Sequence, residues 1–202
     1  SITCGLGDMT LGSDKYYDPS YPDDKTRNYG SGNQDGTIAY PFLTAENIKY
    51  DRRVLSRSGM SVYYPNSTSK NFADITLSWT NAYKYANVFD ANNQTLEYSP
   101  ERKADIICIN LGTNDTNANR IYNYVTTENF DTEFASKVQD FLGIIRSTNP
   151  ESKIVWVVGG MNKNYLSGVQ KAIEALGGEA NNYYLCEVSS GLNDGVGAHP
   201  SK

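Results

Sequence analysis

The sequence predicts an α/β protein, a three-layer α/β/α sandwich with a central parallel sheet. Continuous apolar runs of strand length recur along the chain, and segments with apolar residues at helical spacing separate them. Strands that alternate with helices favour parallel pairing, with helices on both faces of the sheet. The 202 residues contain no repeat and no obvious linker, so we expect one domain spanning residues 1–202.

The elements follow one another after a polar stretch at 11–36, which is rich in Gly, Asp, Asn and Tyr and predicts a long surface loop. The expected elements are, in order, a helix at 37–48, a strand at 52–56, a helix around 79–89, a strand at 104–110, a helix at 130–145, a strand at 152–158, a helix at 166–176 and a strand at 183–188.

Composition excludes several classes of partner. The formal net charge of -5 argues against nucleic acid and anionic membrane surfaces, which reward clusters of Lys and Arg. No apolar run approaches the roughly 18–20 residues that a membrane-spanning helix needs. The three cysteines lack metal-ligand spacing, and the single histidine cannot complete a Cys/His site. We therefore expect no metal and no cofactor.

Polar clusters follow three of the predicted strands directly. They are SRSGMS after the strand at 52–56, LGTNDTN after the strand at 104–110, and LNDGVGAHP after the strand at 183–188. Open parallel sheets bind ligands beyond the carboxyl ends of their strands. We therefore expect these three loops to converge at one edge of the sheet.

Four segments resemble, in chain order, the sequence blocks of the SGNH/GDSL hydrolases. They are SITCG at the start, YPFLTAENIKYDRRVLSRSGMS with Gly59, ADIICINLGTND with Gly112 and Asn114, and AHPS with His199. The subgroup that the chain resembles most is family 2 of the carbohydrate esterases, which deacetylate plant polysaccharides. The resemblance implies a flavodoxin-like sandwich and a secreted, extracellular enzyme acting on acetylated polysaccharide or oligosaccharide.

The resemblance implies a serine esterase site. Ser1 would be the nucleophile and His199 the base, and because the chain has one histidine, any Ser–His mechanism must use it. The oxyanion would be held by the backbone N–H groups of Ser1 and Gly59 and by the side-chain amide of Asn114. A glycine permits close backbone approach, and an amide donates without bringing charge.

The chain departs from the family pattern around the histidine. The family's acid lies three residues before the His, where this chain has Val196, and Asp194 lies two residues further back. Either the glycine-rich loop lets Asp194 reach the imidazole, or a backbone carbonyl orients the ring. We favour the second arrangement, a Ser–His dyad, which the family 2 esterases are known for.

The start of the chain departs from the pattern as well. The family's Gly-Asp and a strand precede the nucleophile, whereas this sequence begins at Ser1. A sheet that lacks a central strand would leave backbone groups unpaired. We therefore expect the intact protein to contain residues upstream of Ser1, and in this subgroup an additional β-sandwich domain often precedes the catalytic one.

Two aromatic residues are candidates for substrate binding. Trp79 could stack on a sugar ring and Tyr64 could line the pocket, with ordinary packing as the alternative for both. Two rival functions also stay open. One is a carbohydrate-binding module with little turnover, and the other is an N-terminal nucleophile hydrolase in which the α-amine of Ser1 replaces His199 as the base.

Overall fold

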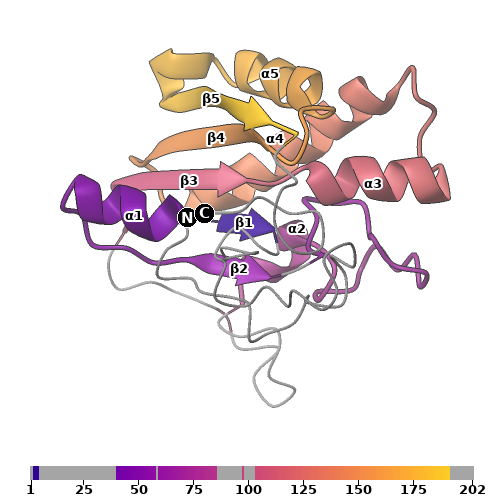
Figure 1. The fold of residues 1–202 in the computed structure, drawn as a ribbon, viewed down its shortest axis with the longest axis horizontal. Coiled ribbons are helices and arrows are strands. Elements are labelled where there is room, and N and C mark those ends of the chain that lie inside the picture. The colour runs from indigo at the N-terminus through magenta and orange to yellow at the C-terminus, as the bar shows by residue number, and fades with distance from the viewer. Residues whose placement is uncertain (1, 5–39, 58, 86–96, 98–102, 192–202) are drawn as a thin grey trace, which may run out of the picture.

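The computed structural model describes residues 2–4, 40–57, 59–85, 97 and 103–191. Its centre is a five-stranded sheet with strand order β2-β1-β3-β4-β5, in which every pair is parallel (Figure 1). The strands are β1 (Ile2–Cys4), β2 (Leu55–Arg57), β3 (Ile106–Asn110), β4 (Lys153–Gly160) and β5 (Tyr183–Ser190). The predicted α/β class with a central parallel sheet is confirmed.

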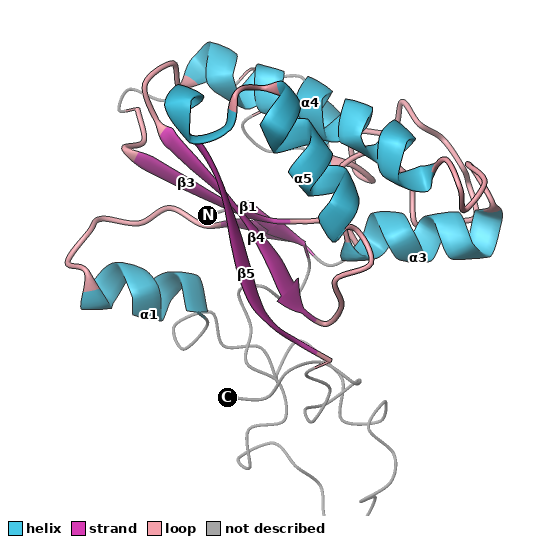
Figure 2. Cartoon of the chain, turned by 90° about the horizontal axis from the view of Figure 1, so that it is seen from above, coloured by secondary structure: helices cyan, strands magenta, loops and turns pink. Residues whose placement is uncertain are grey.

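Helices lie on both sides of this sheet, as Figure 2 shows: α4 and α5 together on one side, and α1 on the other. This arrangement agrees with the predicted three-layer sandwich. The helices are α1 (Tyr40–Asn47), α2 (Trp79–Ala82), α3 (Thr113–Tyr122), α4 (Phe130–Thr148) and α5 (Leu166–Ala175), with a 3₁₀ turn at Gly178–Asn181.

The hydrophobic core lies between the sheet and α4 and α5. Along β4, the alternate residues Ile154, Trp156 and Val158 are buried, because successive side chains of a strand point to opposite faces. The ring of Phe141 from α4 meets the Trp156 indole edge-on, with centroids 6.3 Å apart. Trp156 is therefore a core residue, as its place in an apolar strand predicted.

The first strand differs from expectation. The strand expected upstream of Ser1 stays a prediction, and the structure has a strand that we did not expect, β1, directly after Ser1. Ile2 pairs with Leu55 of β2 and with Ile109 of β3. With β1 in this position, the facing N–H and C=O groups of β2 and β3 find partners that an open gap would deny them.

A second difference concerns LGTNDTN, which we expected to be a loop. Gly112 is the N-cap of α3, and the following residues form the first turns of that helix. Few apolar residues mark this helix, so its periodicity is weak in the sequence. The consequence is that Asn114 stands on a helix that begins at the carboxyl end of β3.

The helix expected around 79–89 begins at Trp79, and α2 ends at Ala82. Residues 86–96 and the predicted loop at 11–36 lie outside the described residues. Within the described ranges, the structure contains no helix that is both long and apolar enough to cross a membrane.

Candidate active site

Gly59 follows β2 at the carboxyl edge of the sheet. Its φ of +80° is a conformation that side chains rarely adopt, whereas a Cβ would meet no described atom within 4 Å. The glycine is thus required by backbone geometry rather than by crowding. Among the described residues, no acceptor receives the Gly59 N–H.

Asn114 reaches the same edge from α3. The turn from β3 into this helix needs a glycine, because Gly112 has a φ of +126° and a Cβ there would lie 2.3 Å from Cδ2 of Tyr165. The buried Trp156 indole donates to the carbonyl of Leu111, at 3.1 Å, and so holds the turn against the core. The start of α3 is therefore fixed by the core.

A hydrogen bond joins these two sides of the site. Nδ2 of Asn114 donates to the carbonyl oxygen of Met60 at 3.1 Å, which ties the helix to the residue after Gly59. Oδ1 of Asn114 accepts from Nδ2 of Asn66, also at 3.1 Å. Two of the polar clusters that the sequence places after separate strands therefore meet.

The carboxylate of Asp115 holds the chain that follows Gly59. It accepts hydrogen bonds from three successive backbone amides: Val62 at 2.8 Å, Tyr63 at 2.9 Å and Tyr64 at 3.0 Å. Asp115 is fully buried, and burial raises its pKa to about 6, while the hydrogen bonds from the amides act in the opposite direction. The carboxylate fixes the path of the 59–66 segment.

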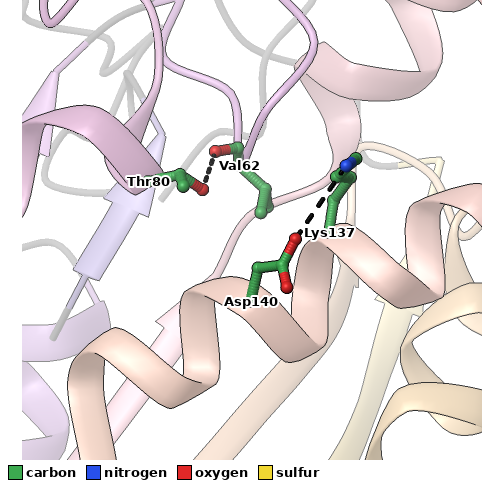
Figure 3. Close-up of polar contacts among 4 residues, drawn as sticks. All are labelled: Val62, Thr80, Lys137 and Asp140. Atoms are coloured by element: carbon green, nitrogen blue, oxygen red, sulfur yellow. Dashed lines mark hydrogen bonds and ion pairs between the residues drawn. The ribbon is translucent and has the colours of Figure 1, made fainter. Parts of the chain in front are cut away.

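Further contacts hold the 59–66 segment from its other sides. The hydroxyl of Thr80 donates to the carbonyl of Val62 at 2.6 Å (Figure 3). The hydroxyl of Tyr124 donates to the carbonyl of Pro65 at 3.1 Å. Lys137 of α4 lies over the ring of Tyr63, with Nζ 4.5 Å from the centroid. Together with Asp115 of α3, these contacts anchor the segment to α2, α3 and α4, and it forms a preorganised support for Gly59.

Within the described ranges, no three His, Cys, Asp or Glu side chains gather as a metal site. The groups described at this edge of the sheet are the backbone N–H of Gly59 and the side-chain amide of Asn114. Such groups stabilise developing negative charge on an oxygen.

Comparison with solved structures places this arrangement in a known fold. An acetyl xylan esterase from Butyrivibrio proteoclasticus matches with a TM-score of 0.71 and 18% identity, over 99% of this chain and 58% of that one. A family two carbohydrate esterase from Cellvibrio japonicus gives 0.73 and 15%, over 99% and 55%. A GDSL-like lipase from Bacteroides ovatus gives 0.55 and 16%, over 99% and 89%.

The chain has the SGNH/GDSL hydrolase fold. It spans less than two thirds of the length of the two carbohydrate esterases. A scan of protein-family models and a search of curated proteins give no match. The resemblance to the SGNH/GDSL hydrolases, and to the family two esterases among them, is confirmed at the level of the fold.

Within the SGNH/GDSL fold, the structure describes two of the predicted site residues, Gly59 and Asn114. Asn114 is bonded to the residue after Gly59, and the part of both residues in an oxyanion hole stays a prediction. Ser1, Asp194 and His199 lie outside the described residues. The assignment of these three residues therefore stays a prediction.

The two aromatic candidates are buried. Trp79 is 5% exposed and Tyr64 is 3% exposed, and both belong to the hydrophobic core. The ring of Tyr64 stacks on that of Tyr124, with centroids 5.8 Å apart, and burial raises the pKa of its phenol. These contacts favour the packing alternative for both residues over the stacking of sugar rings.

Two residues of the site were missed in the sequence. Asp115 lies in the first turn of α3, and Asn66 lies 48 positions before its partner Asn114. The Asp that follows Asn114 could have drawn attention as an acid at a helix N-terminus. Nothing in the sequence marks Asn66, since its role depends on a contact between distant segments.

Proposed function

We propose that this protein is a serine esterase that removes O-acetyl groups from carbohydrate, with acetylated xylan or a related plant polysaccharide as substrate and an extracellular place of action. The observation that carries the proposal is the hydrogen bond from the Asn114 side chain to Met60, the residue after Gly59. It joins the segments that follow β2 and β3 at the carboxyl edge of a parallel sheet, which is where such folds bind ligands. The fold supports carboxylic ester hydrolysis, because the esterases named above share it.

The proposed chemistry runs through an acetyl-enzyme. Oγ of Ser1 attacks the ester carbonyl while His199 takes the hydroxyl proton. The oxyanion is held by the N–H groups of Ser1 and Gly59 and by Nδ2 of Asn114. His199 then protonates the departing sugar oxygen, and water, activated by the same histidine, releases acetate. Either Asp194 or a backbone carbonyl orients the imidazole.

The test is acetate release from acetylated xylan and from 4-nitrophenyl acetate. The parent protein is compared with Ser1→Ala and His199→Ala, and Ser147→Ala, at an exposed serine of α4, is the control. We expect the first two substitutions to abolish release and the control to keep the parent rate. Full activity of Ser1→Ala would overturn the assignment.

Further outcomes of the same assay separate the alternatives. A parent that binds xylan without releasing acetate, and still binds it after Ser1→Ala, would favour a carbohydrate-binding module. Loss of activity in Ser1→Ala but not in His199→Ala would favour an N-terminal nucleophile mechanism. If both substitutions abolish release, Asp194→Ala separates a triad from a dyad, because only a triad loses much of its rate.

A further inference from the structure

The amide of Asn114 can serve an oxyanion in only one orientation. Rotation by 180° about its last side-chain bond exchanges the NH₂ group with the carbonyl oxygen. In one orientation the side chain donates a hydrogen bond to the oxyanion, and in the other it presents a lone pair that repels the negative charge. Something must therefore select the orientation before the substrate arrives.

Two contacts of Asn114 favour the productive orientation. The carbonyl of Met60 is an acceptor only, so the atom that faces it at 3.1 Å is Nδ2 of Asn114. The other atom is then Oδ1, and it must face a donor, which is Nδ2 of Asn66 at 3.1 Å. The donor group of Asn66 thus favours the same orientation of the Asn114 amide as the Met60 carbonyl does.

One amide hydrogen of Asn114 remains for a ligand. Nδ2 carries two hydrogens, and the bond to Met60 uses one of them. Within the described part of the chain, the second hydrogen meets no acceptor, and Asn114 is half-buried rather than fully exposed.

Asn66 is itself held in place. The preceding Pro65 is buried, and its carbonyl accepts from the hydroxyl of Tyr124. One residue earlier, the N–H of Tyr64 is bound by the carboxylate of Asp115. Because the backbone on its N-terminal side is anchored, Asn66 can hold Asn114 with little loss of its own freedom.

We propose that Asn66 is a positioning residue that, together with the carbonyl of Met60, sets the orientation of the Asn114 amide in the oxyanion hole, an inference that rests on the proposed esterase function. Asn66 acts through Asn114 and does not touch the substrate. It should therefore influence the chemical step and leave substrate binding unchanged.

A double-mutant cycle tests this dependence. We expect Asn114→Ala to lower kcat by roughly 10²–10³. Asn66→Ala should lower kcat between about twofold and tenfold, the value of one hydrogen bond, with KM unchanged. Combined with Asn114→Ala, it should cause no further loss, because the amide that it orients is gone. A further loss by the same factor in the double variant would overturn the proposal.

A matched control variant and a charge variant test whether the loss of kcat in Asn66→Ala comes only from a less stable fold. Asn119 of α3 is also half-buried, and its amide makes two hydrogen bonds to the backbone of Val125. Asn119→Ala should therefore lower stability without lowering kcat. Asn66→Asp puts a carboxylate against Oδ1 of Asn114, so its kcat relative to the parent should rise as the pH falls from about 6 to about 3 and that group, whose ordinary pKa is about 4, protonates. A ratio independent of pH would count against positioning.

A spectroscopic readout separates this proposal from the proposed function. The side-chain amide signals of Asn114 in ¹⁵N NMR spectra should shift in Asn66→Ala and stay unchanged in Asn119→Ala. Unchanged Asn114 signals in Asn66→Ala would overturn the positioning role, whatever the activity. Failure of the proposed function looks different: the parent releases no acetate, and the oxyanion role of Asn114 then falls even if its signals shift.

Discussion

Replacing Asp115 by alanine would remove the acceptor that fixes the 59–66 segment. In the parent, Oδ2 binds the N–H of Val62 and Oδ1 binds those of Tyr63 and Tyr64, at 2.8–3.0 Å. Alanine can accept none of these bonds. The three amides would then have to find water, or the segment would have to leave its position beside Asn114.

The expected loss of stability follows from these contacts. Val62 is 0% exposed and Tyr64 is 3% exposed, so water does not reach their amides easily. Three orphaned amides cost roughly 3–9 kcal/mol together. Removal of a buried charge offsets part of this: a pKa raised from 3.8 to about 6 corresponds to about 3 kcal/mol. The difference between these two contributions lies between about 0 and 6 kcal/mol, and we expect a net loss of stability near the middle, about 3 kcal/mol.

Urea unfolding and thermal melting measure this loss. For a chain of 202 residues, about 3 kcal/mol should lower Tm by roughly 6–12 °C. The control is Asp140→Ala on α4, whose carboxylate is 62% exposed and lies 3.9 Å from Nζ of Lys137 (Figure 3). That exposed pair should contribute less than about 1 kcal/mol. If Asp115→Ala costs no more than Asp140→Ala, the carboxylate does not hold the segment.

Three further predictions follow from the same structure. As the pH falls from 7.5 to 4.5, the folded protein should take up a proton at Asp115 before the unfolded chain does, because the folded pKa is the higher one, about 6 against 3.8. The unfolding free energy of the parent should therefore rise by about 2 kcal/mol relative to Asp115→Asn over this range, and a constant difference would contradict the raised pKa. Gly112→Ala should cost more than about 3 kcal/mol, since its Cβ would lie 2.3 Å from a ring atom of Tyr165 at a φ of +126°, and near-parent melting would refute this packing. Arg146→Lys should lower stability by about 2 kcal/mol. The guanidinium donates to five backbone carbonyls and to the hydroxyl of Tyr183, and an ammonium cannot match this geometry. An unchanged urea midpoint would show that these bonds contribute little to stability.

The elements that the sequence predicts well are those with dense apolar patterns. Strands β3, β4 and β5 and helices α4 and α5 lie within a few residues of their expected ranges, because each buries a face whose periodicity can be read directly. Helix α3 was missed because polar residues dominate it, and its start depends on a turn at Gly112. Strand β1 was missed because its pairing depends on two strands far away in the sequence.

The site divides in the same way. The resemblance to the SGNH/GDSL blocks pointed to Gly59 and Asn114, and their places after predicted strands put both at one edge of the sheet, since parallel strands bring their carboxyl ends together there. Asp115 and Asn66 could not be assigned roles, because their partners lie about 50 residues away and a carboxylate or amide alone does not indicate what it will bind. The aromatic candidates Trp79 and Tyr64 show the converse: their type suggested a sugar surface, whereas the fold buries them.

Covalent labelling tests the central claim most directly. A 4-nitrophenyl phosphonate should react with the nucleophile of the intact protein: a bond forms between Ser1 Oγ and phosphorus, and 4-nitrophenolate leaves. Peptide mass spectrometry should find the adduct on Ser1 in the parent, at a much lower rate in His199→Ala and in Asn114→Ala. An adduct on a different residue, or acetate release without any adduct on Ser1, would contradict the account.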